Sequence, residues 1–340
     1  MTMRLHIIGG LVLAAGLAGC TGQTSPDANP EVFKTAEEAV GARRAKLMRD
    51  WQDLASRIAN AERPDVRTRA AAEGFALVLS ADGVEQTIDL TPLSETLINA
   101  NGREREPIRA YLAEQLPAFD RARLKAMGFE KAKPMLLPYM ANMKQTLAMT
   151  PPDAGRAPIV NPVVIDLNWL PTVRWPGSDA RTPVDAEVAA SWKVPAERVS
   201  AAALANRRTA FAREGAAAFQ TTDLPAGLGR YGALREGTDP SILLLPEFLA
   251  MVRKAWKTSD DLVIFFPSRN VINVIERKNE RLLNQMIPQW SQRFGQLTEP
   301  MIGTMILAGD GGLSLLSYAP PTAATKPATG PATRRAYIVN

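Results

Sequence analysis

The predicted sheet of this protein is built on five consecutive apolar residues, Leu262-Val263-Ile264-Phe265-Phe266. A short run without any polar residue is typical of a strand that is buried on both faces, at a central position in a sheet. Pro267–Asn270 then predicts a turn, and Val271–Ile275 predicts a second strand. We expect the remaining elements to pack around this pair of strands.

Further strands and hairpins are predicted on both sides of this pair. Turns at Asp82-Gly83 and at Gly309–Gly312 predict two hairpins, formed by Phe75–Ser80 with Glu85–Leu90 and by Met305–Ala308 with Leu313–Ser317. Other strands are expected at Met135–Tyr139, Ile159–Leu167 and Thr172–Trp175, the last two separated by a break at Pro171.

Helices are predicted between these strands. They are expected over Pro107–Leu116, ending before Pro117, and over Val184–Ala190, Pro195–Phe211, Ile242–Trp256 and Arg277–Phe294. Thr91 is the predicted N-cap of a further helix that starts at Pro92. Pro246 is expected either to deform its helix or to mark the true start of that helix.

A long amphipathic helix is predicted over Glu31–Asn60. Its apolar side chains recur on one helical face, whereas Arg43, Arg44 and other basic residues lie largely elsewhere. The apolar face consists of Phe33, Ala36, Val40, Leu47, Trp51, Leu54 and Ile58. In the interpretation that we favour, this face packs on the domain core; in the alternative, it touches acidic lipid head groups.

Together these patterns predict an α+β fold, with short antiparallel hairpins and a mixed sheet covered by helices, preceded by the long amphipathic helix. The chain has 340 residues, of which 46% are hydrophobic and 22% are charged, as in an ordinary globular protein. We expect a signal peptide (1–19), an acylated cysteine with a flexible tether (20–30), a globular region (31–318) with a candidate subdivision near 150–158, and a disordered tail rich in Pro, Ala and Thr (319–340).

The N-terminus has the features of a bacterial export signal. Arg4 precedes the apolar segment Ile7–Leu17, which is too short to cross a bilayer as a helix, and small residues follow it. Leu17-Ala18-Gly19-Cys20 resembles the lipobox of bacterial lipoproteins. This resemblance implies that Cys20 receives a diacylglycerol thioether, becomes the new N-terminus and is then N-acylated. The membrane is thus expected to hold the chain through a covalent lipid, and Thr21 after the cysteine favours the periplasmic face of the outer membrane.

The composition excludes several classes of chemistry. His6 is the sole histidine and lies in the predicted signal, and Cys20 is the sole cysteine. The mature chain therefore has no disulfide-linked partner, no zinc site of cysteine and histidine, and no Ser-His-Asp triad or Cys-His pair. The net charge is only +5 and basic residues alternate with acidic ones, so we expect no nucleic-acid partner.

Part of the globular region resembles a known bacterial family. Ala205-Asn206-Arg207 ends a predicted helix, Ile242–Glu247 and Asp261-Leu262-Val263 follow, and Pro267-Ser268-Arg269 forms the turn. This order is similar to that of the YtpQ-like family, across roughly residues 75–316. The resemblance implies an α+β fold and brings no established activity, cofactor or catalytic residue. The chain has Asn270 where the family often has Asp, so we transfer no charge-dependent role to that position.

Ser268 and Arg269 are the candidate ligand-binding residues. An arginine in a turn that leaves an apolar sheet can make a bidentate contact with a carboxylate or a phosphate, while Ser268 holds the loop. The alternative, which we favour, is that Arg269 pairs with a carboxylate of its own domain.

Other patterns lack the context that their chemistry requires. Gly227–Gly232 matches the glycine spacing of a dinucleotide-binding loop, but neither a strand before it nor a helix on its last glycine is predicted. Asp260-Asp261 and Asp310–Gly312 offer carboxylates without the spacing of a calcium loop. Trp169 and Trp175 are expected to be core residues rather than a platform for an aromatic ligand. We therefore predict no catalytic residue, no metal site and no cofactor.

From the sequence we expect a lipid-anchored cell-envelope protein that binds a partner or supports envelope assembly, with an envelope protein as the candidate partner. The alternative is an enzyme that uses carboxylates and a divalent metal ion on an envelope polymer. Grouped carboxylates in a deep pocket would favour the enzyme, and a shallow apolar patch beside the tether would favour the binding module.

Overall fold

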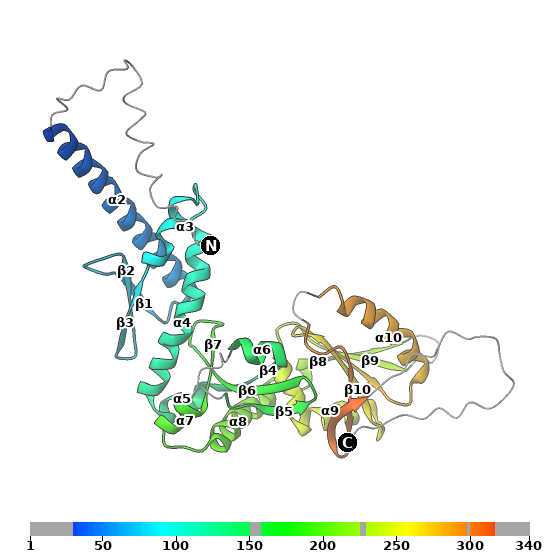
Figure 1. The fold of residues 1–340 in the computed structure, drawn as a ribbon. Helices are drawn as coiled ribbons and strands as arrows, with labels where there is room; N and C mark the ends of the chain where they lie inside the picture. The colour runs from blue at the N-terminus through cyan, green and yellow to red at the C-terminus, as the bar shows by residue number, and fades with distance from the viewer. Residues whose placement is uncertain (1–29, 150–157, 225–228, 298–299, 317–340) are drawn as a thin grey trace, which may run out of the picture.

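The computed structural model describes residues 30–149, 158–224, 229–297 and 300–316, which form an α+β fold (Figure 1). The predicted fold class is confirmed, but the strand pairs of the described residues are antiparallel rather than mixed. An apolar run indicates that both faces of a strand are buried and says nothing about the direction of its neighbours. The predicted signal peptide, Cys20, the tether before residue 30, residues 150–157 and the tail lie outside the described residues.

A three-stranded sheet and several helices form the N-terminal part. The elements are α2 (Pro30–Glu62), β1 (Arg67–Ala70), β2 (Ala76–Ala81), β3 (Val84–Asp89), η1 (Thr91–Leu93), α3 (Ser94–Ile98) and α4 (Arg105–Met127). The sheet has the order β1-β2-β3 and contains the predicted hairpin of β2 with β3. Asp82 and Gly83 have φ angles of 53° and 80°, as a two-residue hairpin turn requires.

The long helix α2 divides into a packed half and an exposed half. Trp51, Ala55 and Ile58 are buried in the hydrophobic cluster of the N-terminal part, which confirms the favoured interpretation for that stretch of the helix. Val40 and Leu47 belong to the same predicted apolar face, but they are 62% and 49% exposed. The prediction that the whole face packs on the core is therefore wrong at Val40 and Leu47.

Two helix predictions in this part are corrected. Thr91 is not a side-chain N-cap: it is the first residue of η1, and its N–H donates to Asp89 Oδ1 at 2.9 Å. Helix α4 does not end before Pro117 but continues through it. Leu116 and Phe119 on either side are buried, and this packing outweighs the one backbone hydrogen bond that Pro117 removes.

A four-stranded sheet lies in the middle of the chain. Its order is β4-β6-β5, with β7 also paired to β6. The elements are α5 (Phe129–Ala132), η2 (Lys133–Met135), β4 (Leu136–Asn142), α6 (Met143–Met149), β5 (Asn161–Val164), β6 (Leu167–Arg174), β7 (Arg181–Pro183), α7 (Ala186–Ser191), α8 (Ala196–Glu214) and η3 (Gly215–Ala218).

Strand β6 runs through Pro171, where the sequence predicted a break. Pro171 lies opposite Pro138 of β4 in the antiparallel register. The two prolines, neither of which has an N–H group to donate, thus face each other in the β4–β6 pair. The absent hydrogen bonds fall at a single position, and β6 continues past it. Trp169 and Trp175 are both buried, at 6% and 1% exposure, so their predicted place in the core is confirmed.

A six-stranded sheet with the order β13-β12-β10-β11-β9-β8 completes the described chain. Pro246 starts α9, which is one of its two predicted outcomes. The elements are β8 (Phe219–Asp223), β9 (Arg230–Leu234), η5 (Pro240–Leu244), α9 (Pro246–Trp256), β10 (Leu262–Ser268), β11 (Val271–Glu276), α10 (Glu280–Phe294), β12 (Met305–Gly309) and β13 (Gly312–Leu316).

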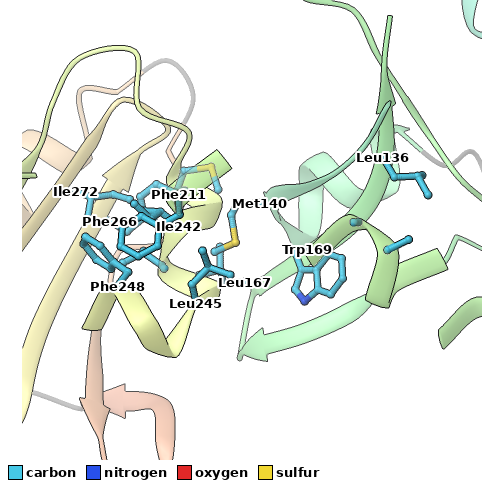
Figure 2. Packing of buried hydrophobic residues seen from close by; sticks show 14 of the residues in the cluster. Leu136, Met140, Leu167, Trp169, Phe211, Ile242, Leu245, Phe248, Phe266 and Ile272 are labelled. Atoms are coloured by element: carbon cyan, nitrogen blue, oxygen red, sulfur yellow. The ribbon is translucent and has the colours of Figure 1, made fainter. Parts of the chain in front are cut away.

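The predicted central strand, β10, is buried on both faces. Leu262, Ile264 and Phe266 belong to the largest hydrophobic cluster, which also includes residues of α8 and α9. Val263 and Phe265 belong to a second cluster on the α10 side. Figure 2 shows the first cluster, where Phe266 and Ile272 of the β10–β11 pair gather with Phe211, Ile242, Phe248 and Met140.

Buried charges hold the N-terminal part together. Arg63, just after α2, makes bidentate contacts with Asp120 of α4 (2.7 and 2.8 Å) and with Asp65 (2.9 and 2.9 Å). Arg123 of α4 contacts Asp65 (2.7 Å) and Asp82 in the β2–β3 turn (2.8 Å). Apart from Asp82, each of these side chains is at most 6% exposed. We call these five residues the charge cluster.

Residues of the second sheet close off the charge cluster. The guanidinium carbon of Arg123 lies 3.7 Å from the centre of the Trp175 ring. Trp175 Nε1 donates to Thr182 Oγ1 at 2.8 Å, and that hydroxyl contacts Asp120 at 3.2 Å. The charge cluster thus joins α2, α4 and the β2–β3 turn to β6 and β7.

The carboxyls of the charge cluster have altered acidity. Burial raises the pKa of Asp65 and Asp82. Asp65 accepts hydrogen bonds from Arg63 and Arg123, and Asp82 accepts them from Arg123 and Lys131. These hydrogen bonds more than offset burial and hold both pKa values below the usual range. The resulting stabilisation is present above about pH 4, the ordinary pKa of an unfolded aspartate. It is lost as the pH falls through the lowered native pKa values.

Arg123→Met is expected to reduce the free energy of unfolding by about 3–5 kcal/mol at pH 7, because it leaves Arg63 as the only buried cation for Asp65 and Asp120. The reduction should be smaller at pH 3, where carboxyls that have lost their cation become protonated. Urea unfolding at both pH values measures this difference. Arg213→Met, at an exposed position of α8, is the control and should change stability by less than about 0.5 kcal/mol. Equal losses at the two pH values would contradict the assignment.

Candidate functional site

A shallow groove lies between the terminal strands of two sheets. β5 ends the four-stranded sheet, β13 ends the six-stranded sheet, and the two strands pack beside each other. The groove has a volume of about 550 Å³. It is lined by Val163, Val164, Ile165, Asp261, Arg277, Leu307 and the hairpin residues 309–315.

The walls of the groove are apolar side chains at the margin of the core. Val163 and Val164 of β5 and Leu313 and Leu315 of β13 pack against the largest hydrophobic cluster but remain partly exposed. The core therefore reaches the surface along the groove. Ile165, in the turn between β5 and β6, is 65% exposed.

Helix α6 starts beside the β5–β6 turn and carries exposed apolar side chains of its own. The N–H of Met143 donates to the carbonyl of Asp166 at 3.2 Å, so the start of α6 is fixed to the β5–β6 turn. Met143 and Leu147 lie one helical turn apart and are 47% and 60% exposed. Together with Ile165, they form what we call the turn patch.

Charged residues line the other side of the groove. Asp261 Oδ2 accepts from Arg277 Nη1 at 3.1 Å, and the Arg277 N–H donates to the Asp261 carbonyl at 2.8 Å. A Cβ on Gly309 would lie 3.0 Å from Asp261 Oδ1, so glycine lets the β12–β13 hairpin approach this carboxylate closely. Asp310 also lines the groove. Within the described ranges there is no group of three or more His, Cys, Asp or Glu residues positioned to hold a metal ion.

Arg269, the first candidate from the sequence, lies at another place. Its guanidinium carbon is 3.7 Å from the centre of the Tyr139 ring, and Nη2 donates to the Met140 carbonyl at 2.7 Å. These contacts tie the β10–β11 hairpin to β4. Ser268 pairs with Val271 and forms a bridge with Pro300, so both candidate residues make contacts within the protein.

The glycine-rich stretch and Asp260, which the sequence analysis also considered, have structural roles. Gly227 and Leu228 lie outside the described residues. Strand β8 does precede the glycines, contrary to the prediction, but Gly232 lies inside strand β9, where no helix begins. A Cβ at Gly232 would lie 2.0 Å from the Phe219 ring, so this glycine makes room for packing. Asp260 accepts from the Lys278 N–H at 2.7 Å and fixes the turn after β11.

The sequence analysis missed the groove as a site. It identified Asp261 and Asp310 as isolated carboxylates, and the structure brings these two residues, about 50 positions apart, to one groove. A signal for the apolar wall was present in Val163-Val164-Ile165, where three β-branched residues follow one another without polar alternation. Such a run indicates burial or an interface, and only the fold distinguishes the two.

Comparisons with known proteins found no match: no family model, no curated protein and no solved structure matches this chain. The resemblances to the lipobox and to the YtpQ-like family stay predictions that rest on the motifs quoted above. None of the helices in the described part is both long enough and apolar enough to cross a bilayer.

Arg269→Ala is expected to reduce the free energy of unfolding by about 1–2 kcal/mol, because the stacking contact with Tyr139 and the hydrogen bond to Met140 are both lost. Arg269→Lys should recover only part of the loss, since an ammonium group lacks the planar face. Urea unfolding measures both variants. Full stability of Arg269→Ala would show that the side chain is not held within the fold and would favour a ligand-binding role.

Proposed function

We propose that this protein is a lipid-anchored module of the bacterial cell envelope that holds a partner protein on the groove and the turn patch. The observation that carries the proposal is the exposure of Ile165 in a groove whose apolar walls continue into the core, together with the exposure of Met143 and Leu147 on α6, which starts at the same β5–β6 turn. The lipobox resemblance at Cys20 supports the anchor. The periplasmic face of the outer membrane is the proposed location.

The physical argument for a partner is the apolar surface itself. Side chains as large as Leu147 and Ile165 gain roughly 1.5–3 kcal/mol each when they are fully transferred from water into an apolar environment. Exposed apolar side chains that gather at one place mark an interaction surface more often than scattered ones do. A partner that covers the turn patch and enters the groove would bury these side chains together.

The groove also defines the chemistry of the partner. Its apolar walls suit Leu, Ile or Val side chains of an extended segment. The far side of the groove has two acidic residues, Asp261 and Asp310, and one basic residue, Arg277. This excess of negative charge favours a basic residue at the end of that segment. We therefore propose an envelope protein with an apolar and weakly basic segment as the partner.

The alternative is an enzyme that uses carboxylates and a divalent metal ion. One observation bears on it: Asp261 and Asp310 share the groove. Asp261 is already paired with Arg277, and the apolar walls supply no ligand for a hard cation. The groove thus supports binding better than catalysis. Helix α6 and strand β5, which carry the exposed apolar side chains, lie in the middle of the molecule, away from the exposed half of α2 (Figure 1).

Cys20→Ser is expected to abolish incorporation of labelled fatty acid and to leave an uncleaved precursor, because the thioether can form only on the cysteine thiol. Metabolic labelling followed by mass measurement of the mature chain tests this. Labelling that persists in the variant, or maturation at the same position, would contradict the anchor.

Ile165→Asp combined with Leu147→Asp is expected to reduce crosslinking to a specific envelope partner at least tenfold, because a charge placed in an apolar interface must be desolvated. The acylated full chain carries a photo-crosslinking residue at Val164 in the groove, and products are identified by mass. The control variant is Ile98→Asp, at a residue of the N-terminal part that is 60% exposed. A crosslinking pattern that is the same for all three proteins would contradict the proposed surface.

A further inference from the structure

The N-terminal half of α2 extends beyond the packed body of the protein (Figure 1). From Glu38 to Asp50 every residue except Met48 is exposed, and burial begins at Trp51. Because α2 begins at Pro30, about 20 residues of helix, roughly 30 Å in length, precede the packed half. We call the stretch 38–50 the free half of α2.

The free half has an apolar stripe with an arginine on each side. Val40 and Leu47 lie seven residues apart, on the same face of the helix, and are 62% and 49% exposed. At about 100° per residue, Arg43 and Arg44 project on opposite sides of the line through Val40 and Leu47. Arginine side chains in this position can extend their stems along an apolar surface while the charged ends reach outward.

The charges of the free half favour an acidic surface. It contains the cations Arg43, Arg44, Lys46 and Arg49 against the acids Glu38 and Asp50. Each basic side chain close to a bilayer with anionic lipids adds to the attraction, in addition to the apolar contact of the stripe.

The proposed anchor places this helix next to a bilayer. The chain from Cys20 to Pro30 spans at most about 35 Å when fully extended, so an acylated Cys20 keeps the start of α2 close to the lipid head groups. We propose that the free half of α2 lies on the anionic lipid surface, with Val40 and Leu47 at the acyl boundary and Arg43 and Arg44 at the head groups. This inference rests on the lipid anchor of the proposed function.

A second copy of the chain is the competing occupant of the stripe. In a parallel pair of helices joined along Val40 and Leu47, Arg43 and Arg44 of each copy would flank the seam and meet like charges of the other copy. The phosphate groups of a lipid surface are negatively charged and therefore attract the same arginines. The charge pattern therefore favours lipid over self-association.

The test uses the acylated full chain in vesicles, with its acylation first confirmed by mass. Because Cys20 is the sole cysteine and is blocked by its lipid, Val40→Cys or Leu47→Cys can each carry a single nitrobenzoxadiazole fluorophore. The vesicles contain phosphatidylethanolamine with about 30% phosphatidylglycerol, a composition chosen to provide the anionic surface, and a spin-labelled lipid that quenches the fluorophore. We expect strong quenching at both positions.

Glu38→Cys is the matched control, since residue 38 lies on the opposite face of the helix from Val40 and Leu47. Its fluorophore should be quenched several-fold less. Arg43→Gln with Arg44→Gln should reduce quenching at position 47 at least threefold, while circular dichroism shows an unchanged helix content. High salt should have the same effect as the double variant.

The outcomes separate the inference from the proposed function. A chain without acyl groups on Cys20 would overturn both the anchor and this inference. An acylated chain whose labels at 40 and 47 are quenched no more than the label at 38 would overturn the inference alone. A blue shift of these labels that depends on protein concentration and is independent of lipid composition would also overturn it, in favour of self-association.

Discussion

The structure depends on the burial of opposite charges at one place. Arg63 contacts two aspartates and Arg123 contacts three, all with buried side chains except Asp82, and Trp175 covers the Arg123 guanidinium. Ions in such a site are tolerated only when each has a partner, so the loops and turns that carry Asp65 and Asp82 must keep their positions. The charge cluster therefore connects the β2–β3 turn and α4 to Trp175 and Thr182 of the four-stranded-sheet part.

Much of the fold follows from short-range patterns. The Asp82-Gly83 turn, the apolar run of β10 and the start of α9 at Pro246 are local features, and the structure has all three. The errors arise where tertiary contacts override a local preference. Pro117 lies within α4 because neighbouring residues are buried, and Pro171 lies within β6 because another proline faces it across the ladder. No pattern in the sequence shows which residue will face a proline.

The candidate site was less predictable than the fold. The sequence indicated Arg269 as a functional residue because of its place after an apolar strand, but its contacts with Tyr139 and Met140 depend on β4, about 130 residues earlier in the chain. The groove is likewise formed by the edges of two sheets that are far apart in sequence. Residue types can be read from a sequence, whereas the meeting of two sheet edges is a property of the whole fold.

Helix α4 belongs to two hydrophobic clusters at once. Ile108 and Leu112 lie in the cluster of the N-terminal part, and Leu124 lies in the largest cluster. One continuous helix of 23 residues, about 35 Å long, joins the two clusters through Pro117, and Asp120 and Arg123 of its C-terminal half belong to the charge cluster. The N-terminal part and the four-stranded sheet are therefore connected through packed side chains on one helix rather than through a linker. The edge of the groove that β5 forms thus belongs to the same connected unit as the packed half of α2.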